Sequence, residues 1–363
     1  MYIQILVSLL VSMVTALIIM PWLLKSCYKH NIFDTLNDRK VHRNNVPRLG
    51  GVVFVPSMIL GLIAGLAVLK VGDGTGLQFI HTTTFIVGGG TVIIYLVGIF
   101  DDLWGVSARV KFIIQLLAAL SFPYCTLNIN NLYGFCGVYE IPFWAMYVLT
   151  AFVVLLIINA INLIDGIDGL STSLSLTALA IFGWHYSQTC QQPVLLIFIA
   201  ALAGALLAFL PFNLFGKAEK GTKSFMGDSG SLMLGVTLSY LTIKYCMDAP
   251  KTLLPHRDDG MVVAISAVLV PCFDLCRVAL CRLRRGVGVF HADKTHLHHK
   301  FMAKGFSMHA TLVIIVGLQL AFYALNMGLY HLGARIDVTL LVDVVLFTCL
   351  NVWLPVKDVT IKK

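Results

Sequence analysis

Residues 193–212 read PVLLIFIAALAGALLAFLPF, a stretch without a charged side chain that is long enough to cross a lipid bilayer as a helix. Similar stretches recur along the whole chain, in which 58% of the residues are hydrophobic, 12% are charged and the mean hydropathy is +0.86. Soluble globular chains are less apolar than this. The sequence therefore predicts an all-α, polytopic transmembrane helical bundle in which residues 1–363 form one membrane domain.

About eleven apolar stretches, separated by polar breaks, are candidate membrane-spanning helices. They cover residues 2–24, 50–69, 81–99, 111–127, 142–161, 171–187, 193–212, 229–246, 261–281, 309–328 and 336–354. The first stretch has no basic segment before it and no small-residue cleavage site after it, so we expect it to be retained as a span. The polar loops between the stretches are too short to form a soluble domain.

The basic residues predict the orientation of the bundle. All but five of the 26 lysine and arginine residues fall in loops on one side of the predicted membrane. The five on the other side are Lys70, Lys244, Lys251, Arg257 and Arg335. By the positive-inside rule, the basic loops and the C-terminus are cytoplasmic, and an odd number of spans places the N-terminus outside. The net charge of +8 forms no basic stripe with interleaved aromatic residues, so we expect anionic lipid or phosphate as the partner and no nucleic acid.

Two adjacent carboxylates, Asp101 and Asp102, follow the third apolar stretch and precede Arg109 and Lys111. Adjacent carboxylates beside an apolar helix are costly unless a cation or water compensates them. They indicate a divalent metal ion or an acid–base pair, although an ordinary solvated turn explains them as well.

The stretch NAINLIDGIDGL, residues 159–170, places a polar side chain at every third position, including Asn162, Asp165 and Asp168. In a helix these side chains follow one slowly drifting face, and the two glycines are expected to break that helix. Broken helices at membrane depth occur where the backbone lines a wet, protein-enclosed cavity, which a polar substrate needs. A helix cap with a turn would explain one of the aspartates but hardly both.

Two further polar clusters lie later in the chain. The stretch MGDSGS, residues 226–231, suits the start of a helix, where Asp228 either caps the helix or holds a metal ion while free backbone N–H groups meet a phosphate. The stretch HADKTHLHHK, residues 291–300, contains four of the eleven histidines. Its mixed donors suit a diphosphate better than the closed ligand set of a zinc site, and an exposed loop without a function is the remaining alternative.

In this order, the four clusters resemble the polyprenyl-phosphate N-acetylhexosamine-1-phosphate transferase superfamily (glycosyltransferase family 4 type), which also contains the phospho-N-acetylmuramoyl-pentapeptide translocases. The resemblance covers most of the chain. The form HLHH at residues 296–299, after Asp293 and Lys294, is similar to the undecaprenyl-phosphate GlcNAc-1-phosphate transferase branch, which starts O-antigen, enterobacterial common antigen or teichoic acid linkage synthesis. That branch implies a UDP-N-acetylhexosamine, chiefly UDP-N-acetylglucosamine, as donor, undecaprenyl phosphate as acceptor and UMP as product.

Two alternatives remain at this point. One is the peptidoglycan translocase of the same superfamily. The other is a polytopic transporter, whose polar groups usually lie near the middle of the membrane, whereas here they lie at the ends of predicted helices.

The resemblance also implies a role for each candidate residue. It assigns catalysis to Asp101, Asp102, Asp165 and Asp168. It assigns a Mg²⁺ ion, with Mn²⁺ as a substitute, to Asp228 and Asn162. The substrate-binding residues that it implies are Arg48, Arg109, Lys111, Asn213, Asp293, Lys294, His296, His298 and His299. We further expect a multi-pass protein of the bacterial cytoplasmic (inner) membrane, with its active site on the cytoplasmic face, in contact with membrane lipid and able to form a homodimer.

Overall fold

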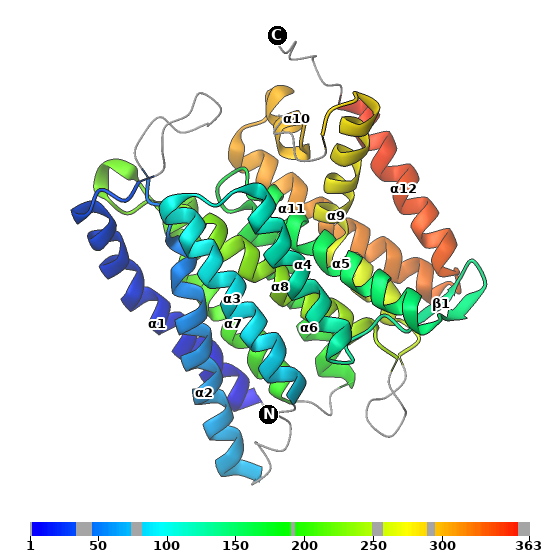
Figure 1. The fold of residues 1–363 in the computed structure, drawn as a ribbon, viewed down its shortest axis with the longest axis horizontal. Helices are drawn as coiled ribbons and strands as arrows, with labels where there is room; N and C mark the ends of the chain where they lie inside the picture. The colour runs from blue at the N-terminus through cyan, green and yellow to red at the C-terminus, as the bar shows by residue number, and fades with distance from the viewer. Residues whose placement is uncertain are drawn as a thin grey trace.

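A computed structural model describes residues 2–33, 46–73, 82–189, 193–248, 257–288 and 295–354. The described part is a bundle of long helices with one small hairpin (Figure 1). The long helices are α1 (Tyr2–Lys29), α2 (Phe54–Asp73), α3 (Thr82–Trp104), α4 (Ala108–Tyr124), α5 (Phe143–Ile164), α6 (Leu170–Thr189), α7 (Pro193–Leu214), α8 (Gly227–Cys246), α9 (Gly260–Arg284), α11 (Met308–His331) and α12 (Ile336–Trp353). The short elements are η1 (Gly50–Val53), η2 (Ala218–Lys220) and α10 (Leu297–Ala303), and strands β1 (Asn131–Phe135) and β2 (Val138–Glu140) form the antiparallel hairpin.

The predicted all-α bundle is confirmed, and each of the predicted apolar stretches coincides with a helix to within a few residues. Within the described ranges, 7 helices are long and apolar enough to cross a membrane, namely α1, α2 extended by η1, α5, α7, α9, α11 and α12. Eleven spans therefore remain a prediction. The start of α1 and the end of α12 lie at opposite ends of the bundle (Figure 1), as an odd number of spans requires.

Helix α8 lies at the centre of the bundle, and α3, α5, α6 and α9 pack around it. Two glycines allow its closest contacts. A Cβ atom at Gly98 of α3 would lie 2.5 Å from the Cα atom of Ser229, and one at Gly235 of α8 would lie 2.6 Å from the Cα atom of Ile158 in α5. Small residues at such crossings let helix backbones approach closely in a membrane. The ends of α3 and α5 are thereby held against the start of α8.

The predicted break after residue 164 is confirmed. Helix α5 ends at Ile164, α6 begins at Leu170, and Gly169 between them has a φ of +77°, a conformation that favours glycine. We call residues 165–169 the aspartate turn. The turn places two acidic side chains at the junction of two helices.

Helix α9 is also broken, at Val268, where φ is −126° and ψ is 16°. Pro271 lacks an N–H group and cannot continue the helical hydrogen-bond ladder. Gln319 of α11 replaces the missing bonds, because its side-chain oxygen accepts from the N–H of Val270 at 3.0 Å and its Nε2 atom donates to the carbonyl of Ser266. The break therefore leaves these two backbone groups satisfied, as the interior of a membrane requires.

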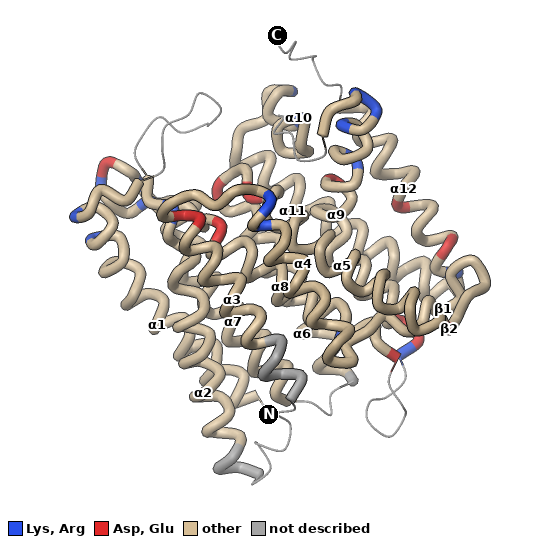
Figure 2. The backbone as a smooth tube through the Cα atoms, viewed as in Figure 1, with Lys and Arg blue, Asp and Glu red and all other residues tan. Residues whose placement is uncertain are grey.

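Charged residues gather near the ends of the helices, and the middle of the bundle carries few of them (Figure 2). One end, where α3 terminates and α10 lies, contains both acidic and basic positions (Figure 2). The candidate site lies at this end.

Candidate active site

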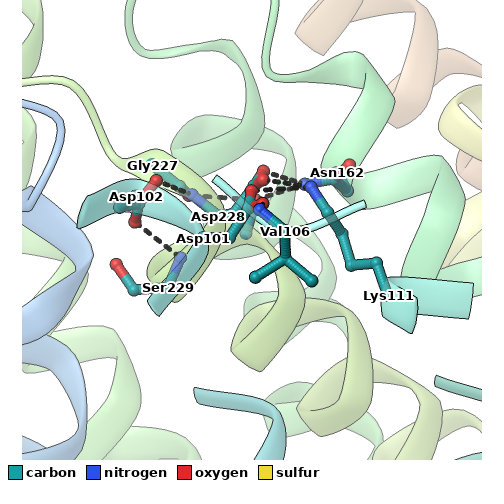
Figure 3. A network of polar contacts seen from close by, with 9 residues as sticks. Asp101, Asp102, Val106, Lys111, Asn162, Gly227, Asp228 and Ser229 are labelled. Carbon is teal, nitrogen blue, oxygen red and sulfur yellow. Dashed lines mark hydrogen bonds and ion pairs between the residues drawn. The ribbon is translucent and has the colours of Figure 1, made fainter. Parts of the chain in front are cut away.

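Lys111, in the first turn of α4, lies between two carboxylates from different helices. Its Nζ atom donates to Oδ2 of Asp101 in α3 at 2.7 Å and to Oδ2 of Asp228 in α8 at 2.6 Å (Figure 3). The other oxygen of Asp101 accepts from the N–H of Val106 at 2.6 Å. All three charged side chains are largely shielded from solvent. One ammonium group thus neutralises two carboxylates that the sequence separates widely.

Asn162, near the end of α5, contacts the same aspartate from the other side. Its Nδ2 atom donates to Oδ1 of Asp228 at 2.7 Å (Figure 3). The same atom donates to the hydroxyl of Ser231 at 2.9 Å. The side-chain oxygen of Asn162 forms no hydrogen bond within the described ranges. The predicted metal ligands Asp228 and Asn162 are therefore neighbours, and each presents oxygen to the site.

Asp102 caps α8. Its Oδ1 atom accepts from the N–H of Asp228 at 2.9 Å and its Oδ2 atom from the N–H of Ser229 at 3.0 Å (Figure 3). Met226, the residue that precedes α8, forms no capping bond with its side chain. A carboxylate at a helix N-terminus satisfies free N–H groups and interacts favourably with the helix dipole. The interpretation of Asp228 as the cap is therefore wrong, because Asp102 has that role and leaves the side chain of Asp228 free to bind Lys111 and Asn162.

Asp165 lies in the aspartate turn. It is half-buried and accepts no hydrogen bond from the residues that the structure describes. Burial, together with the nearby carboxylates of Asp228 and Asp168, raises the pKa of Asp165 to about 8, although the positive charge of Arg48 opposes this shift. Asp165 can therefore bind a ligand or a cation without breaking an internal contact.

Asp168 and Asn213 bind within the chain. Lys223 donates to Oδ2 of Asp168 at 2.5 Å and to the carbonyl of Asn213 at 2.7 Å. The side-chain oxygen of Asn213 accepts from the N–H of Gly169 at 2.6 Å, and its Nδ2 atom donates to the carbonyl of Ser224 at 2.9 Å. These bonds fix the aspartate turn to the segment before α8. Lys223 is a site residue that spacing alone does not reveal.

The His-rich loop reaches the aspartate turn through His298, in the first turn of α10. The ring is 1% exposed, and both of its nitrogens lack a hydrogen-bond partner in the described chain. A Cβ atom at Gly166 would collide with this ring, and the centroid of the His299 ring lies 4.1 Å away. Burial, then the nearby His299 and His296, lower the pKa of His298 to about 3. The site therefore contains a neutral, buried imidazole with unused hydrogen-bonding capacity.

The remaining predicted residues are distributed as follows. His296 is buried, with its Nδ1 atom 2.9 Å from Oδ2 of Asp274 in α9. Arg109 is exposed in the first turn of α4. Asp293 and Lys294 lie outside the described residues. The sequence-based candidates do not include Asp274, because it lies inside the predicted apolar span 261–281. An acidic residue within a span is itself a signal of function and could have identified it.

The site offers oxygen donors of the kind that Mg²⁺ prefers. Within the described ranges, no group of three or more His, Cys, Asp or Glu side chains converges as a metal cluster. Mg²⁺ is usually bound through one or two carboxylates, with water and substrate phosphates completing its shell. Asp228, the free oxygen of Asn162 and the unpartnered Asp165 provide oxygen donors of this kind, and Lys111 shows that the cluster already binds positive charge.

Residues 84–246 match the sequence profile of glycosyl transferase family 4. A protein of Bacillus subtilis (strain 168), named a probable undecaprenyl-phosphate N-acetylglucosaminyl 1-phosphate transferase, is 31% identical over 324 residues, which are 86% of this chain and 81% of that protein. The chain belongs to glycosyl transferase family 4.

Two other relatives in this family have related names. A decaprenyl-phosphate N-acetylglucosaminephosphotransferase of Mycobacterium tuberculosis is 31% identical over 79% of this chain and 72% of its own length. An undecaprenyl-phosphate alpha-N-acetylglucosaminyl 1-phosphate transferase of Salmonella typhi is 29% identical over 80% of this chain and 74% of its own length. The family profile spans Asp101 to Asp228 and ends before the His-rich loop.

Proposed function

We propose that the protein transfers N-acetylglucosamine 1-phosphate from UDP-N-acetylglucosamine to undecaprenyl phosphate and releases UMP. The names of the family 4 relatives support the sugar phosphate and the lipid acceptor. The observation that carries the proposal is the convergence of four separate sequence clusters on one site. There Lys111 joins Asp101 to Asp228, near Asp165 and His298, whose side chains have no hydrogen-bond partner in the described ranges.

The reaction exchanges one phosphoanhydride for another. An oxygen of the lipid phosphate forms a bond to the β-phosphorus of the donor, the bond from that phosphorus to the bridging oxygen breaks, and UMP leaves with the electron pair. Because the bonds made and broken are alike, catalysis consists mainly of holding two anions together and neutralising charge. Lys111, Arg109 and Arg48 supply positive charge for this purpose.

Deprotonation is a small part of the chemistry. A phosphate monoester has a second pKa of about 6 and is largely dianionic at neutral pH, so the acceptor needs no strong base. Asp165 accepts no hydrogen bond from the residues that the structure describes, so we assign it to contact with the acceptor phosphate or with the metal ion. Asp102 acts indirectly, because its two oxygens bind backbone N–H groups at the start of α8 and so position Asp228.

We propose Mg²⁺ as the cofactor, replaceable by Mn²⁺, with Asp228 and Asn162 as ligands and Asp101 beside them. When bound, the ion neutralises the charge of the donor diphosphate. The buried nitrogens of His298 have no hydrogen-bond partner among the described residues. Buried polar groups are nearly always satisfied by a partner, so this supports a place for the His-rich loop at the diphosphate.

We place the site at the cytoplasmic face of a bacterial inner membrane. The distribution of basic loops supports this orientation. Nucleotide would then enter from water, and the lipid phosphate from the adjoining bilayer.

The test is UMP release by the purified protein with undecaprenyl phosphate and, side by side, UDP-N-acetylglucosamine, UDP-N-acetylgalactosamine and UDP-MurNAc-pentapeptide. We expect release with the first donor, its loss in EDTA and its recovery with Mg²⁺. Lys111→Met should lower the rate by about 10²-fold. Lys244→Met is the matched control, because Lys244 lies near the opposite end of α8, and it should stay within about threefold of the parent. UMP release from UDP-MurNAc-pentapeptide alone would show that the protein carries out the peptidoglycan reaction instead. No UMP release with any of the three donors would refute the proposed function.

A further inference from the structure

Asp274 is a buried carboxylate in the middle of a predicted membrane span, yet it contacts the His-rich loop. Its residue is 0% exposed. A buried charge is costly unless it is paired and hydrogen-bonded. Here Oδ2 bonds to Nδ1 of His296 at 2.9 Å, while Oδ1 accepts from the N–H of Leu297 at 3.0 Å and from Arg277 at 2.7 Å. Within the described residues, the hydrogen bonds of this carboxylate thus go to the His-rich loop, the start of α10 and Arg277.

Arg277 strengthens the same attachment. It lies one turn after Asp274 in α9, and the guanidinium nitrogen that pairs with Asp274 also donates to the carbonyl of Thr295 at 2.5 Å. Leu297 is the first residue of α10, and the preceding His296 forms no capping bond with its side chain. Two side chains of α9 therefore bind Thr295, His296 and Leu297 in succession, and Asp274 satisfies a free N–H group at the start of α10.

The contact also decides where the imidazole hydrogen lies. An ionised carboxylate only accepts hydrogen bonds, so Nδ1 of His296 must donate to Asp274. In the neutral ring, the hydrogen-bond partner of one nitrogen sets the role of the other. Nε2 is then the atom of His296 that is left to face a ligand.

The ring held in this way is linked to the aspartate turn. His296 is stacked on His298, with centroids 5.8 Å apart and planes 8° from parallel, and His298 packs against Gly166, next to Asp165. A carboxylate in α9 therefore determines how the loop meets the site formed by α3, α4, α5 and α8.

We propose that Asp274 is a positioning residue that fixes the Nδ1–H tautomer and the orientation of His296, so that the unprotonated Nε2 of His296 accepts a hydrogen bond from an N–H or O–H group of the UDP-sugar. This proposal rests on the proposed function for the identity of the donor. The tautomer itself follows from the contacts of Asp274 alone.

The decisive variant is Asp274→Asn, which keeps the shape of the side chain but can present an N–H group to His296 and so move the ring hydrogen to Nε2. Asp343→Asn is the matched control, since Asp343 of α12 is also 0% exposed and accepts from Asn326 at 3.0 Å, and it replaces a buried carboxylate outside the site. Both proteins are purified in detergent. The measurements are thermal stability, UMP release, KM for each substrate and the ¹⁵N spectrum of labelled histidine, with His296→Gln identifying the signals of His296.

We expect wild type and Asp343→Asn to show the Nδ1–H pattern for His296, and Asp274→Asn to show the Nε2–H pattern. In Asp274→Asn, Nε2 of His296 carries a hydrogen and can no longer accept, so kcat/KM for the UDP-sugar should fall about 10–100-fold, as when a buried polar group loses its hydrogen-bond partner. KM for the lipid phosphate should stay close to wild type. A purely structural role would change both KM values or neither.

An Nε2–H pattern in the wild type would overturn the proposal, even if Asp274→Asn does not fold. Near-normal UDP-sugar turnover in Asp274→Asn would overturn it as well. A wild type that releases no UMP from any UDP-sugar would refute the proposed function whatever tautomer His296 shows, so the two failures are told apart.

Discussion

Replacing Asp102 or Asp228 by asparagine tests whether Asp102 caps α8 while Asp228 acts in catalysis. Asp102→Asn removes the carboxylate that receives two backbone N–H groups of α8 at 2.9 and 3.0 Å. Asp228→Asn removes the carboxylate that binds Lys111 at 2.6 Å and Asn162 at 2.7 Å. We expect the first change to act mainly on stability and the second mainly on catalysis.

The magnitudes follow from these contacts. An amide at position 102 can accept from one N–H group but turns its NH₂ toward the other, so one charge-assisted bond worth about 1.5–3 kcal/mol is lost. The charge at the helix N-terminus contributes about 0.3–2 kcal/mol more, so the expected loss of unfolding free energy is on the order of 2–5 kcal/mol. An amide at position 228 can still accept from Asn162, and Lys111 retains Asp101, so stability should stay within about 1 kcal/mol. UMP release should fall by about 10²-fold, because charge neutralisation at the diphosphate is lost.

The assay combines thermal unfolding in detergent with UMP release at saturating Mg²⁺, at a temperature at which both variants are folded. Asp102→Asn should unfold several degrees below the wild type and lose less activity than Asp228→Asn. The reverse result, in which Asp102→Asn keeps the wild-type midpoint while Asp228→Asn unfolds early and turns over normally, would show that Asp228 is the cap and would refute this assignment.

Further predictions concern the buried ion pair, the histidines and the topology. Lys223→Met removes the ammonium group that binds the buried carboxylate of Asp168 and should lower the free energy of unfolding by about 3–5 kcal/mol, whereas adding Asp168→Asn should restore much of it. Because the pKa of His298 is lowered to about 3, the unfolded chain binds a proton below pH 6.5 that the native chain does not. Acidification from pH 7 to 5 should therefore cost about 2 kcal/mol that His298→Gln does not lose, as thermal unfolding across this pH range would show. Metal analysis of the wild type should find no stoichiometric zinc, and His298→Ala should lower activity without changing metal content. A single cysteine at Lys304, in a cysteine-free variant, should resist an impermeant thiol reagent in intact cells, and labelling there would reverse the predicted orientation.

The sequence is sufficient to locate the helices and the broken segment. Hydropathy is a local property, so the apolar stretches coincide with helices to within a few residues. The break at residues 165–169 is likewise encoded locally, by glycines and by the spacing of polar side chains. The four clusters also meet as expected, because each lies at a helix end on the same side of the bundle.

The sequence does not reveal which groups within the chain each polar side chain binds. Asp102 and the N–H group that it caps are 126 residues apart, and no local pattern relates them. Asp101 and Asp102 are adjacent but project about 100° apart around the helix axis, so one binds Lys111 and the other binds α8. Asn213 has the residue type expected of a nucleotide contact, yet both ends of its amide bind backbone groups.

Gln319 makes the break in α9 rigid. A helix interrupted by proline often serves as a hinge, because the backbone groups freed at the break can exchange partners as the two halves swing. In α9, the freed groups of Ser266 and Val270 are both bound by one side chain of α11, so the angle is fixed as in a rigid elbow. The half of α9 that carries Asp274 then moves with α11 as one body. Any opening that admits nucleotide or lipid to the site therefore has to arise from other elements.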